Sequence, residues 1–433
     1  MSAMWSASAP PLPDIVGQHV EEAAHLSHMR SALTRAPHPR LHALHRLDDR
    51  LAAHLDGIAV AGDEGWAACE EILDGGSAGA VFTCAVRAIE DGHEARIDRM
   101  LSLAQALPAA RAELASALGW VSANWLQGLT AQLFASSGAV RQGLAIVACV
   151  THRVDPGTGL TSALSAADTA LRACALRAAG DCGRQDLRQA CVDAARRDDD
   201  PMIRFWAARA AVLLGERRVG LDVLHNLALE AGPYRRGALH LLLKVLPPGD
   251  AASVLRQLAA APAADRDLLS GAGVTGDPNF VPWLIERMRE PDAARLAGES
   301  FALLTGCDLS SAAFMKVPEE GDEGEDTEED AAAPNAIEED PLSLDEDGDL
   351  PMPDAVKTLT WWTENAQRFA AGTRYFLGAP LDAPHCRMVL RSGYQRQRIA
   401  AAEYLSLLQP GTPVFNTAAP SWRQQRWLAA MSA

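Results

Sequence analysis

Apolar positions in the middle of the chain recur with the spacing of amphipathic α-helices. The segments IRFWAARAAVLLG and YRRGALHLLLKVL carry Ala and Leu at this spacing, and second amphipathic stretches, GLDVLHNLALE and AASVLRQLAAA, follow them after Gly or Pro. Ala and Leu favour helices, whereas β-branched and aromatic residues, which are enriched in strands, contribute little to these segments. The pattern therefore predicts pairs of helices rather than a sheet.

This helical pair recurs with a period of about 31 residues. Arginines mark the start of the Ala/Leu helix in successive units, at Arg111, Arg141, Arg172, Arg204, Arg235, Arg266 and Arg295. One pair cannot bury its apolar face alone, so neighbouring pairs must stack. We expect an all-α fold, an α-solenoid of seven or eight HEAT-like helical hairpins that resemble the short repeats first recognised in phycobilisome lyases. The repeated arginines are expected mainly to stabilise stacking, by reaching an acidic group or a helix C-terminus in the adjacent unit. A ligand-facing role is the alternative.

Composition divides the chain into four parts. We expect an N-terminal helical segment over residues 1–79, the repeat array over 80–316, an acidic linker over 317–354 and a helical C-terminal module over 355–433. Residues 319–354 hold 17 Asp and Glu and no Lys or Arg, which equals the formal net charge of −17 for all 433 residues. Such a segment repels itself and cannot bury a core, so we expect it to be disordered.

The C-terminal module differs from the array in charge and in aromatic content. It has nine Lys and Arg against three Asp and Glu, and 10 of the 23 aromatic residues. Because Trp, Tyr and Arg dominate binding hot spots, the module supplies candidate partner-binding residues. These are Trp362, Arg374, Tyr394, Arg396, Arg398, Trp422, Arg423 and Arg426. The alternative is a structural role, which we favour for Trp361, Phe369, Phe376 and Tyr404. A module of 79 residues would have only marginal stability on its own, so we expect it to pack on the array.

Signals for catalysis or metal binding are weak. Gly75–Gly79 matches the G-x-S-x-G nucleophile motif, but it follows a predicted helix instead of the strand that this motif requires. Seven histidines lie in the first 54 residues, and Glu22 and His25 have Glu-x-x-His spacing, but no second such pair follows. Asp345, Asp347 and Asp349 resemble the start of a calcium loop that lacks its distal Glu. We expect no catalytic, cofactor or metal site.

Cysteine usage and hydropathy bear on the compartment. The eight cysteines form no C-x-x-C pair, the N-terminus lacks the basic and apolar regions of a secretory signal, and no apolar run is long enough to span a bilayer. We expect a reduced, cytoplasmic protein that does not enter a membrane. The acidic net charge disfavours bulk nucleic-acid binding.

Long strings at both ends of the chain carry a more specific resemblance. They are RLDDRLAAHLDGIAVAG (46–62), WWTENAQRFAAGTRYFLG (361–378), GYQRQRIAAAEYLSLLQPGTPVFNT (393–417) and WRQQRW (422–427). Together with the array, they resemble a bacterial HEAT-like repeat family of unknown activity that is associated with type VI secretion spike and effector gene clusters. The resemblance covers nearly the whole chain apart from the acidic segment. It implies an accessory role in loading or folding a secreted effector, and it supplies no catalytic residues.

The sequence thus favours a non-catalytic scaffold for protein–protein interaction, an adaptor or chaperone for a type VI effector, PAAR or spike protein. Two alternatives remain. One is a HEAT-like module that binds nucleic acid, and the other is a lyase-like enzyme of the phycobilisome-related repeat class. A shared repeat does not by itself imply shared chemistry.

Overall fold

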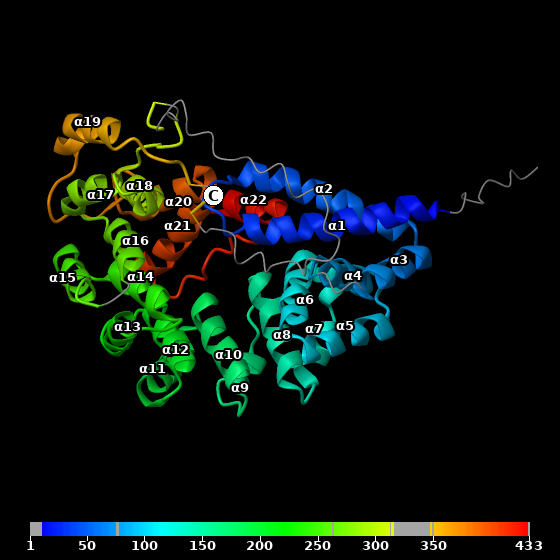
Figure 1. Cartoon of the computed structure of the whole chain (residues 1–433). Helices are drawn as coiled ribbons and strands as arrows, with labels where there is room; N and C mark the ends of the chain where they lie inside the picture. Colours follow the sequence, from blue (N-terminus) through cyan, green and yellow to red (C-terminus); the bar gives the residue numbers. More distant parts are fainter. Residues whose placement is uncertain are drawn as a thin grey trace, which may run out of the picture.

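The computed structural model describes residues 11–74, 78–261, 264–311, 313–315, 347–348 and 350–431. Within these ranges the chain forms the helices α1 to α22 and two strands of two residues each. The helices follow one another along a curved array, so the predicted all-α solenoid is confirmed (Figure 1). The G-x-S-x-G serine, Ser77, and most of the acidic linker lie outside the described residues.

Two long helices precede the array. Helix α1 spans Pro13–Leu33 and α2 spans Leu41–Val60, and the two pack against each other. Helix α1 also packs on the first two helices of the array. In Figure 1 they lie across the top of the array, in dark blue. Leu44, Leu51, Leu55 and Ile58 recur at helical spacing along α2 and are buried. This stripe fixes which face of α2 meets its neighbours.

Eight helical hairpins then stack in chain order within the described residues, and the first of them begins at Asp63, inside the segment 1–79 that was expected to precede the array. Each consists of a first helix and an inner helix that packs on the inner helices of neighbouring units. The hairpins are α3 (Asp63–Asp74) with α4 (Ala78–Asp91), α5 (Glu94–Ala106) with α6 (Pro108–Trp120), α7 (Leu129–Ala135) with α8 (Ala139–Thr151), α9 (Thr158–Ala163) with α10 (Thr169–Asp181), α11 (Arg188–Arg197) with α12 (Pro201–Leu213), α13 (Val219–Leu229) with α14 (Arg235–Val245), α15 (Pro248–Leu258) with α16 (Asp265–Thr275), and α17 (Val281–Arg287) with α18 (Pro291–Thr305).

Local sequence sets the helix starts. Asp168 caps α10 by accepting a hydrogen bond from the Leu171 N–H (2.8 Å), and Asp200 caps α12 ahead of Pro201 at the first helical position. Short polar side chains satisfy the free N–H groups of a first turn, and proline has no N–H there to satisfy. These signals let inner helices begin at a defined residue in successive units.

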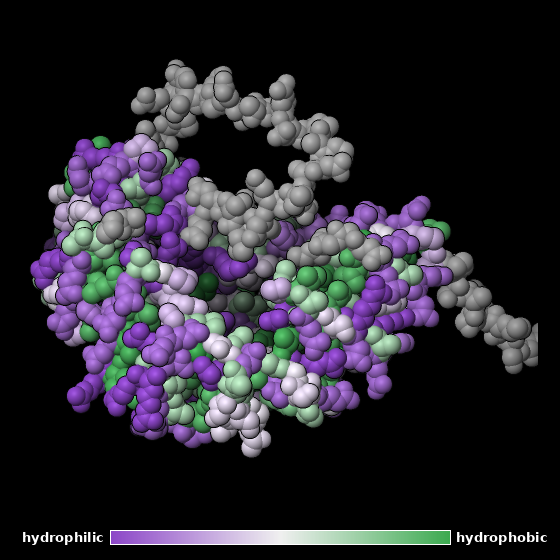
Figure 2. All heavy atoms as spheres, turned by 60° about the horizontal axis from the view of Figure 1, so that its bottom comes forward, coloured by the Kyte–Doolittle hydropathy of each residue, from purple (hydrophilic) through white to green (hydrophobic). Residues whose placement is uncertain are grey.

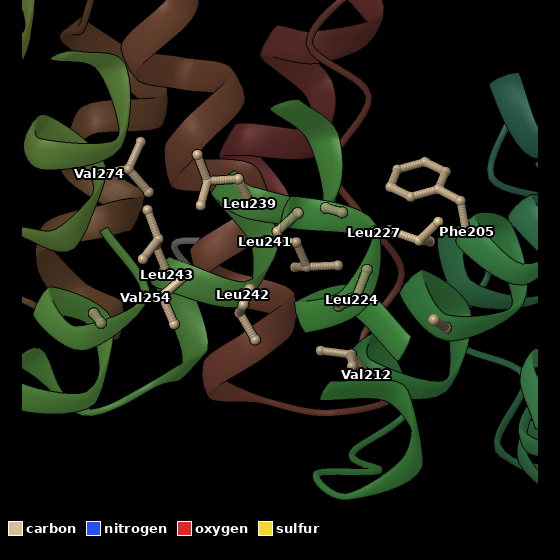
Figure 3. Close-up of a cluster of buried hydrophobic side chains, with 14 of the residues drawn as sticks. Phe205, Val212, Leu224, Leu227, Leu239, Leu241, Leu242, Leu243, Val254 and Val274 are labelled. Carbon is tan, nitrogen blue, oxygen red and sulfur yellow. The ribbon is translucent and has the colours of Figure 1, made fainter. Parts of the chain in front are cut away.

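The array has a continuous core of small and branched residues between its two helical layers. Figure 3 shows part of it, with Leu224 and Leu227 of α13 beside the buried leucines of α14. Alanines dominate the inner layer from α10 to α12, including Ala175, Ala207 and Ala211. Small side chains let inner helices approach closely, which curves the array toward its inner face.

The C-terminal module follows the acidic segment. It contains α19 (Ala355–Asn365), α20 (Ala383–Ser392), α21 (Gln395–Leu408) and α22 (Ser421–Ala430). Between α19 and α20, strands β1 (Tyr375–Phe376) and β2 (Ala379–Pro380) form a hairpin, which departs from the expected all-helical module. Leu377 and Gly378 both have positive φ, +49° and +79°, as a two-residue type I′ turn requires. The module has a core that includes Phe376 and Tyr404, whereas Phe369 is buried in the core of the array and Trp361 is half-buried against it.

The module packs on the array, along the C-terminal ends of seven successive inner helices. The β-hairpin donates to α18, where the Leu377 N–H bonds to Leu303 O (2.7 Å). The chain then runs along the array toward the array's N-terminal end. The Gly411 N–H bonds to Leu213 O of α12 (3.2 Å), and the Val414 N–H bonds to Asp181 O of α10 (2.9 Å). The last turn of a helix leaves carbonyls without intrahelical partners, and this segment, which we call the strap (residues 409–420), supplies donors to them.

The end of the module joins the N-terminal helices to the array. Asp48 of α2 is fully buried and accepts from Arg30 of α1 (2.7 Å) and from the Ser421 N–H of α22 (2.6 Å). Gln395 of α21 donates to Thr34 O and Thr417 O, both at 2.9 Å. The α1–α2 pair and the C-terminal module therefore meet near the label C in Figure 1.

The repeated arginines lie at the opposite ends of the inner helices. Arg141 of α8 reaches Asp98 of the preceding hairpin (3.1 Å), and Arg172 of α10 reaches Asp198 of the following one (3.0 Å). Arg111 of α6 donates to Ala104 O of its own hairpin (3.1 Å). Stacking between units is therefore one of several uses of this position.

No described helix combines the length and the apolar character that crossing a membrane would require.

Candidate functional site

Two of the predicted partner-binding arginines cap helix ends inside the molecule. Arg423 donates to three carbonyls at the end of α6, Gly119 O (2.6 Å), Trp120 O (3.2 Å) and Val121 O (2.9 Å). Arg374 does the same for two helices, donating to Leu243 O (2.6 Å), Lys244 O and Leu246 O of α14 and to Thr275 O of α16 (3.0 Å). A guanidinium has five donors and a charge that complements the negative end of a helix dipole. These side chains stabilise the array from within.

Arg398 holds the helices of the C-terminal module together. It is fully buried and donates to Leu390 O (2.8 Å), to the Gln395 side-chain oxygen (2.6 Å) and to the Gln424 side-chain oxygen. Burial lowers the pKa of Arg398 to about 10. Trp422 is half-buried and packs edge-to-face on Trp120 of α6, with ring centroids 5.0 Å apart. Both side chains belong to internal packing.

Tyr394 and Arg396 lie at a large groove in the middle of the molecule. Arg396 donates to both carboxylate oxygens of Glu299 on α18, at 3.1 and 2.9 Å. The Arg40 guanidinium lies over the Tyr394 ring, 4.4 Å from its centroid, in a cation–π contact. The start of α21 thereby faces both the end of the array and the α1–α2 loop.

The last two predicted residues lie nearer the outside. Trp362 of α19 is half-buried beside Phe369, with ring centroids 5.2 Å apart. Arg426 of α22 is exposed. Among the eight predicted residues, the structure therefore brings only Tyr394 and Arg396 together at one concave site.

The central groove is the candidate functional site. It has a volume of about 1780 Å³, and the surface is hollowed near the centre of the molecule in Figure 2. Three parts of the chain enclose it: the α1–α2 loop with the start of α6, the inner helices α14, α16 and α18, and the module helices α20 and α21. Because these parts are far apart in sequence, the groove exists only when the module is docked. A concave, largely preformed site of mixed character is where a ligand is expected.

Helix α14 presents a basic face to the groove. Arg236, His240 and Lys244 are four residues apart and line one wall. Lys244 forms a largely buried ion pair with Glu403 of α21, whose carboxylate Arg209 also approaches at 4.0 Å. The His240 Nε2 lies 3.0 Å from the Ser270 hydroxyl of α16. Burial and the neighbouring Lys244 charge lower the pKa of His240 to about 3, so this imidazole is neutral at pH 7.

Acidic side chains in the groove are few, and one is partly neutralised. Burial raises the pKa of Glu113 on α6 to about 7, and it outweighs the opposing charge of Arg35. Glu299 is engaged by Arg396, although its burial raises its pKa as well. The groove is therefore more cationic at neutral pH than a count of its Asp and Glu residues indicates.

The end of the acidic segment occupies one side of the groove mouth. Arg266 binds the Asp347 carboxylate through both terminal nitrogens, one of them at 2.9 Å. Arg295 donates to Gly348 O (3.1 Å) and to Leu350 O. Asp347 and Leu350 are both buried. Asp347, one of the three aspartates that resemble a calcium loop, is thus engaged by an arginine. The other two, Asp345 and Asp349, lie outside the described residues.

Sequence reasoning misses the groove and its contact with Asp347. It favours stacking for Arg266 and Arg295 because they continue the repeat, with a ligand-facing role as the alternative. The sequence has no signal that the acidic segment returns to these two arginines. The four-residue spacing of Arg236, His240 and Lys244 is a usable signal, because such residues share a helix face.

Metal ligands do not gather in the described part of the chain, where no three His, Cys, Asp or Glu residues are placed to hold an ion. Two of the N-terminal histidines do meet, with His19 Nδ1 and His54 Nδ1 3.1 Å apart. Their rings also contact edge-to-face, with centroids 5.1 Å apart. This pair joins α1 to α2.

Comparison with known proteins bears on the array alone. Residues 157–244 match the family model of HEAT repeats, and they cover the helices α9 to α14. Neither the curated proteins nor the solved structures gave a match. HEAT repeats generally mediate protein–protein interaction, which fits a scaffold. The chain is therefore an α-solenoid whose middle hairpins are HEAT-like repeats.

Proposed function

We propose that this protein is a non-catalytic scaffold whose central groove binds a protein partner. The observation that carries this proposal is the groove itself, about 1780 Å³ in volume and enclosed by the array, the N-terminal helices and the C-terminal module. Its walls combine cations such as Arg35 and Arg236 with exposed apolar side chains such as Met388 and Ile399. A surface of this kind suits a polypeptide segment better than a small apolar ligand.

More specifically, we propose an adaptor or chaperone that holds a type VI secretion effector, PAAR or spike component in the cytoplasm. The resemblance of the terminal strings, above all residues 393–417 and 422–427, supports this role. In the fold, residues 393–400 form part of one wall of the groove, and residues 409–417 belong to the strap along the array. A family whose members share residues 393–400 would share this wall of the groove.

Within this proposal, the candidate contact residues fall into two sets. Tyr394 and Arg396 lie in the groove and would touch the partner there. Trp362 and Arg426 lie outside the groove and would serve a second contact on the outer surface. The remaining four, Arg374, Arg398, Trp422 and Arg423, act indirectly, because they hold the module in place.

The test is affinity capture of the tagged full-length protein from its host, followed by mass spectrometry. The comparison variant carries Arg35→Glu and Arg40→Glu at the groove, and the matched control carries Arg196→Glu and Arg197→Glu on α11, away from the groove. Enrichment of a spike, PAAR or toxin protein with the wild type and the control, but not with the groove variant, supports the proposal. Co-purification of nucleic acid, or of metabolic enzymes alone, contradicts it.

A further inference from the structure

One side of the groove already binds a polypeptide segment, which belongs to the chain itself. The Asp347 carboxylate receives two hydrogen bonds from the Arg266 guanidinium, the bidentate geometry that arginine forms best with carboxylates. Arg295 binds the backbone carbonyls of Gly348 and Leu350. One arginine thus recognises an acidic side chain, and the other recognises the main chain beside it.

An apolar contact completes this recognition. Leu350 is 5% exposed, and the residues that follow it, Pro351 and Met352, also line the groove. Met315 pairs with Pro353 in an isolated antiparallel bridge, so the segment adds an extended strand-like stretch at the mouth. The groove therefore binds the carboxylate of Asp347 and, three residues later, the side chain of Leu350, after which the extended stretch begins.

The same chemistry continues beyond the bound segment. Arg35 and Arg40 of the α1–α2 loop line the groove, and the side chain of Arg35 donates to Ser31 of α1. Met388 of α20 and Ile399 of α21 are 53% and 40% exposed on the groove wall. The groove therefore offers cations and apolar surface beyond those that residues 347, 348 and 350–352 cover.

We infer that the central groove recognises an extended acidic segment of the partner protein, with a carboxylate on Arg266 and an aliphatic side chain in the Leu350 position. The chain's own Asp347–Leu350 contact occupies this position and competes with the partner for it. This inference rests on the proposed function, because it names the chemistry of the partner that the scaffold holds. A contact within one chain has a high effective concentration, so a partner must supply additional contacts along the groove to displace it.

The probe is a fluorescein-labelled peptide of residues 342–354, LSLDEDGDLPMPD, titrated with the full-length protein and followed by anisotropy. The receptor variant Asp347→Asn with Leu350→Ala weakens the internal contact. We expect this variant to bind the peptide at least about tenfold more tightly than the wild type, because the intramolecular competitor is weakened. Adding Arg266→Ala and Arg295→Ala to it should weaken binding by about tenfold or more, because charge-assisted hydrogen bonds are lost. The matched control, Arg289→Ala, removes an exposed arginine outside the groove and should leave binding unchanged.

Four results would overturn the inference. The first is equal binding of a peptide in which Asn and Gln replace Asp and Glu, and the second is unchanged binding after loss of Arg266 and Arg295. The third is that the folded Asp347→Asn, Leu350→Ala protein does not bind the peptide at millimolar concentration. The fourth is that a DNA duplex displaces the labelled peptide at a lower concentration than unlabelled peptide does. If the arginine-to-alanine variant does not fold, Arg266→Lys serves instead. It keeps the charge but loses the bidentate geometry, and we expect weaker binding by a few-fold.

Affinity capture separates this inference from the proposed function. Capture of a secretion partner that is unaffected by loss of Arg266 and Arg295 would leave the scaffold standing and remove the acidic-segment inference. Peptide binding with the expected pattern, but without capture of any spike, PAAR or toxin protein, would retain the groove chemistry and remove the secretion role.

Discussion

The two ends of the inner helices carry arginines in contrasting surroundings. At the C-terminal ends, Arg374 and Arg423 are largely buried and each donates to three or more carbonyls. At the N-terminal ends, Arg141 and Arg172 remain partly exposed and make single ion pairs. The first set comes from the C-terminal module, which contacts seven of the eight described inner helices, whereas the second comes from the repeats themselves.

This difference shows where the stability of the array comes from. A repeat array stabilises itself mainly through contacts between neighbouring units, and its curvature is then free to vary. Here the C-terminal module contacts seven successive inner helices, so it fixes their spacing over most of the array. At the N-terminal edge, Arg141 and Arg172 contact only adjacent hairpins, and Arg266 and Arg295 bind the end of the acidic segment. We expect substitutions at the strap edge to cost far more stability than substitutions at the edge of repeated arginines.

The largest effect should follow Arg398→Met, which removes the charge that joins α20, α21 and α22. Three acceptors, Leu390 O and the side-chain oxygens of Gln395 and Gln424, would lose their donor in a buried site. At about 1–3 kcal/mol for each buried unsatisfied group, we expect a loss of about 4 kcal/mol in the free energy of unfolding. Urea unfolding followed by circular dichroism measures it. The control Arg197→Met, on an exposed side chain, should change the free energy by less than about 0.5 kcal/mol.

Arg423→Ala should be the next largest, with a loss of about 3 kcal/mol. It leaves Gly119 O, Trp120 O and Val121 O at the end of α6 without their donor. Arg426→Ala, three residues later on the exposed face of α22, is the matched control and should be close to neutral. Equal effects of the two substitutions in urea unfolding would contradict the view that the module stabilises helix ends.

Gly183→Ala tests how closely the strap approaches the array. Gly183 follows α10 with φ of +69°, and a Cβ there would lie 2.1 Å from Gly411 O. Both the backbone strain and the displaced strap contribute, so we expect a loss of about 2 kcal/mol. Gly249→Ala, in α15 with open space around it, should stabilise the protein by about 0.5–1 kcal/mol. Differential scanning calorimetry of both variants gives opposite shifts in Tm if this is correct.

His240, on the inner helix α14, should make the free energy of unfolding depend on pH. Burial and the charges of Lys244 and Arg236 lower its pKa from 6.5 to about 3 on folding, against the opposing charge of Glu403. Between pH 6.5 and 3 the unfolded chain binds the proton that the folded chain does not, so stability is full above pH 6.5 and falls as the pH is lowered. The expected slope is up to about 1.4 kcal/mol per pH unit. In urea unfolding from about pH 7 to about pH 5, His240→Asn should flatten this dependence, and an unchanged slope would exclude His240 as its source.

The hairpins are predictable because each one repeats the same local signals. Ala and Leu at helical spacing, Asp at helix starts and Gly or Pro between helices act within a few residues, so they can be recognised in sequence. The type I′ turn at Leu377 and Gly378 escapes this reasoning, since leucine is an unusual residue for a positive φ. Its surroundings, the carbonyls of Leu303 and Leu304 in α18, hold it in place.

The groove is not predictable, because it depends on contacts between segments hundreds of residues apart. The same composition that predicts hot spots, Arg beside Trp and Tyr, also suits the capping of helix ends, and sequence alone does not separate these roles. Arg423 and Arg426 illustrate this: both lie in WRQQRW, yet one is buried against α6 and the other is exposed. Only the path of the strap, set by tertiary packing, decides which arginine faces inward.

The smallest effect should come from the repeated arginines. Arg172 pairs with Asp198 at 3.0 Å between side chains that are 26% and 24% exposed. Exposed or partly exposed pairs contribute about 0–1 kcal/mol and weaken as salt screens them. We expect Arg172→Ala to lower the free energy of unfolding by about 0.5 kcal/mol at low salt and by less in about 1 M NaCl. Because the strap contacts α10 through Val414 as well, the array should keep its spacing without this pair. A loss as large as that of Arg423→Ala would mean that the repeated arginines, rather than the strap, hold neighbouring units together.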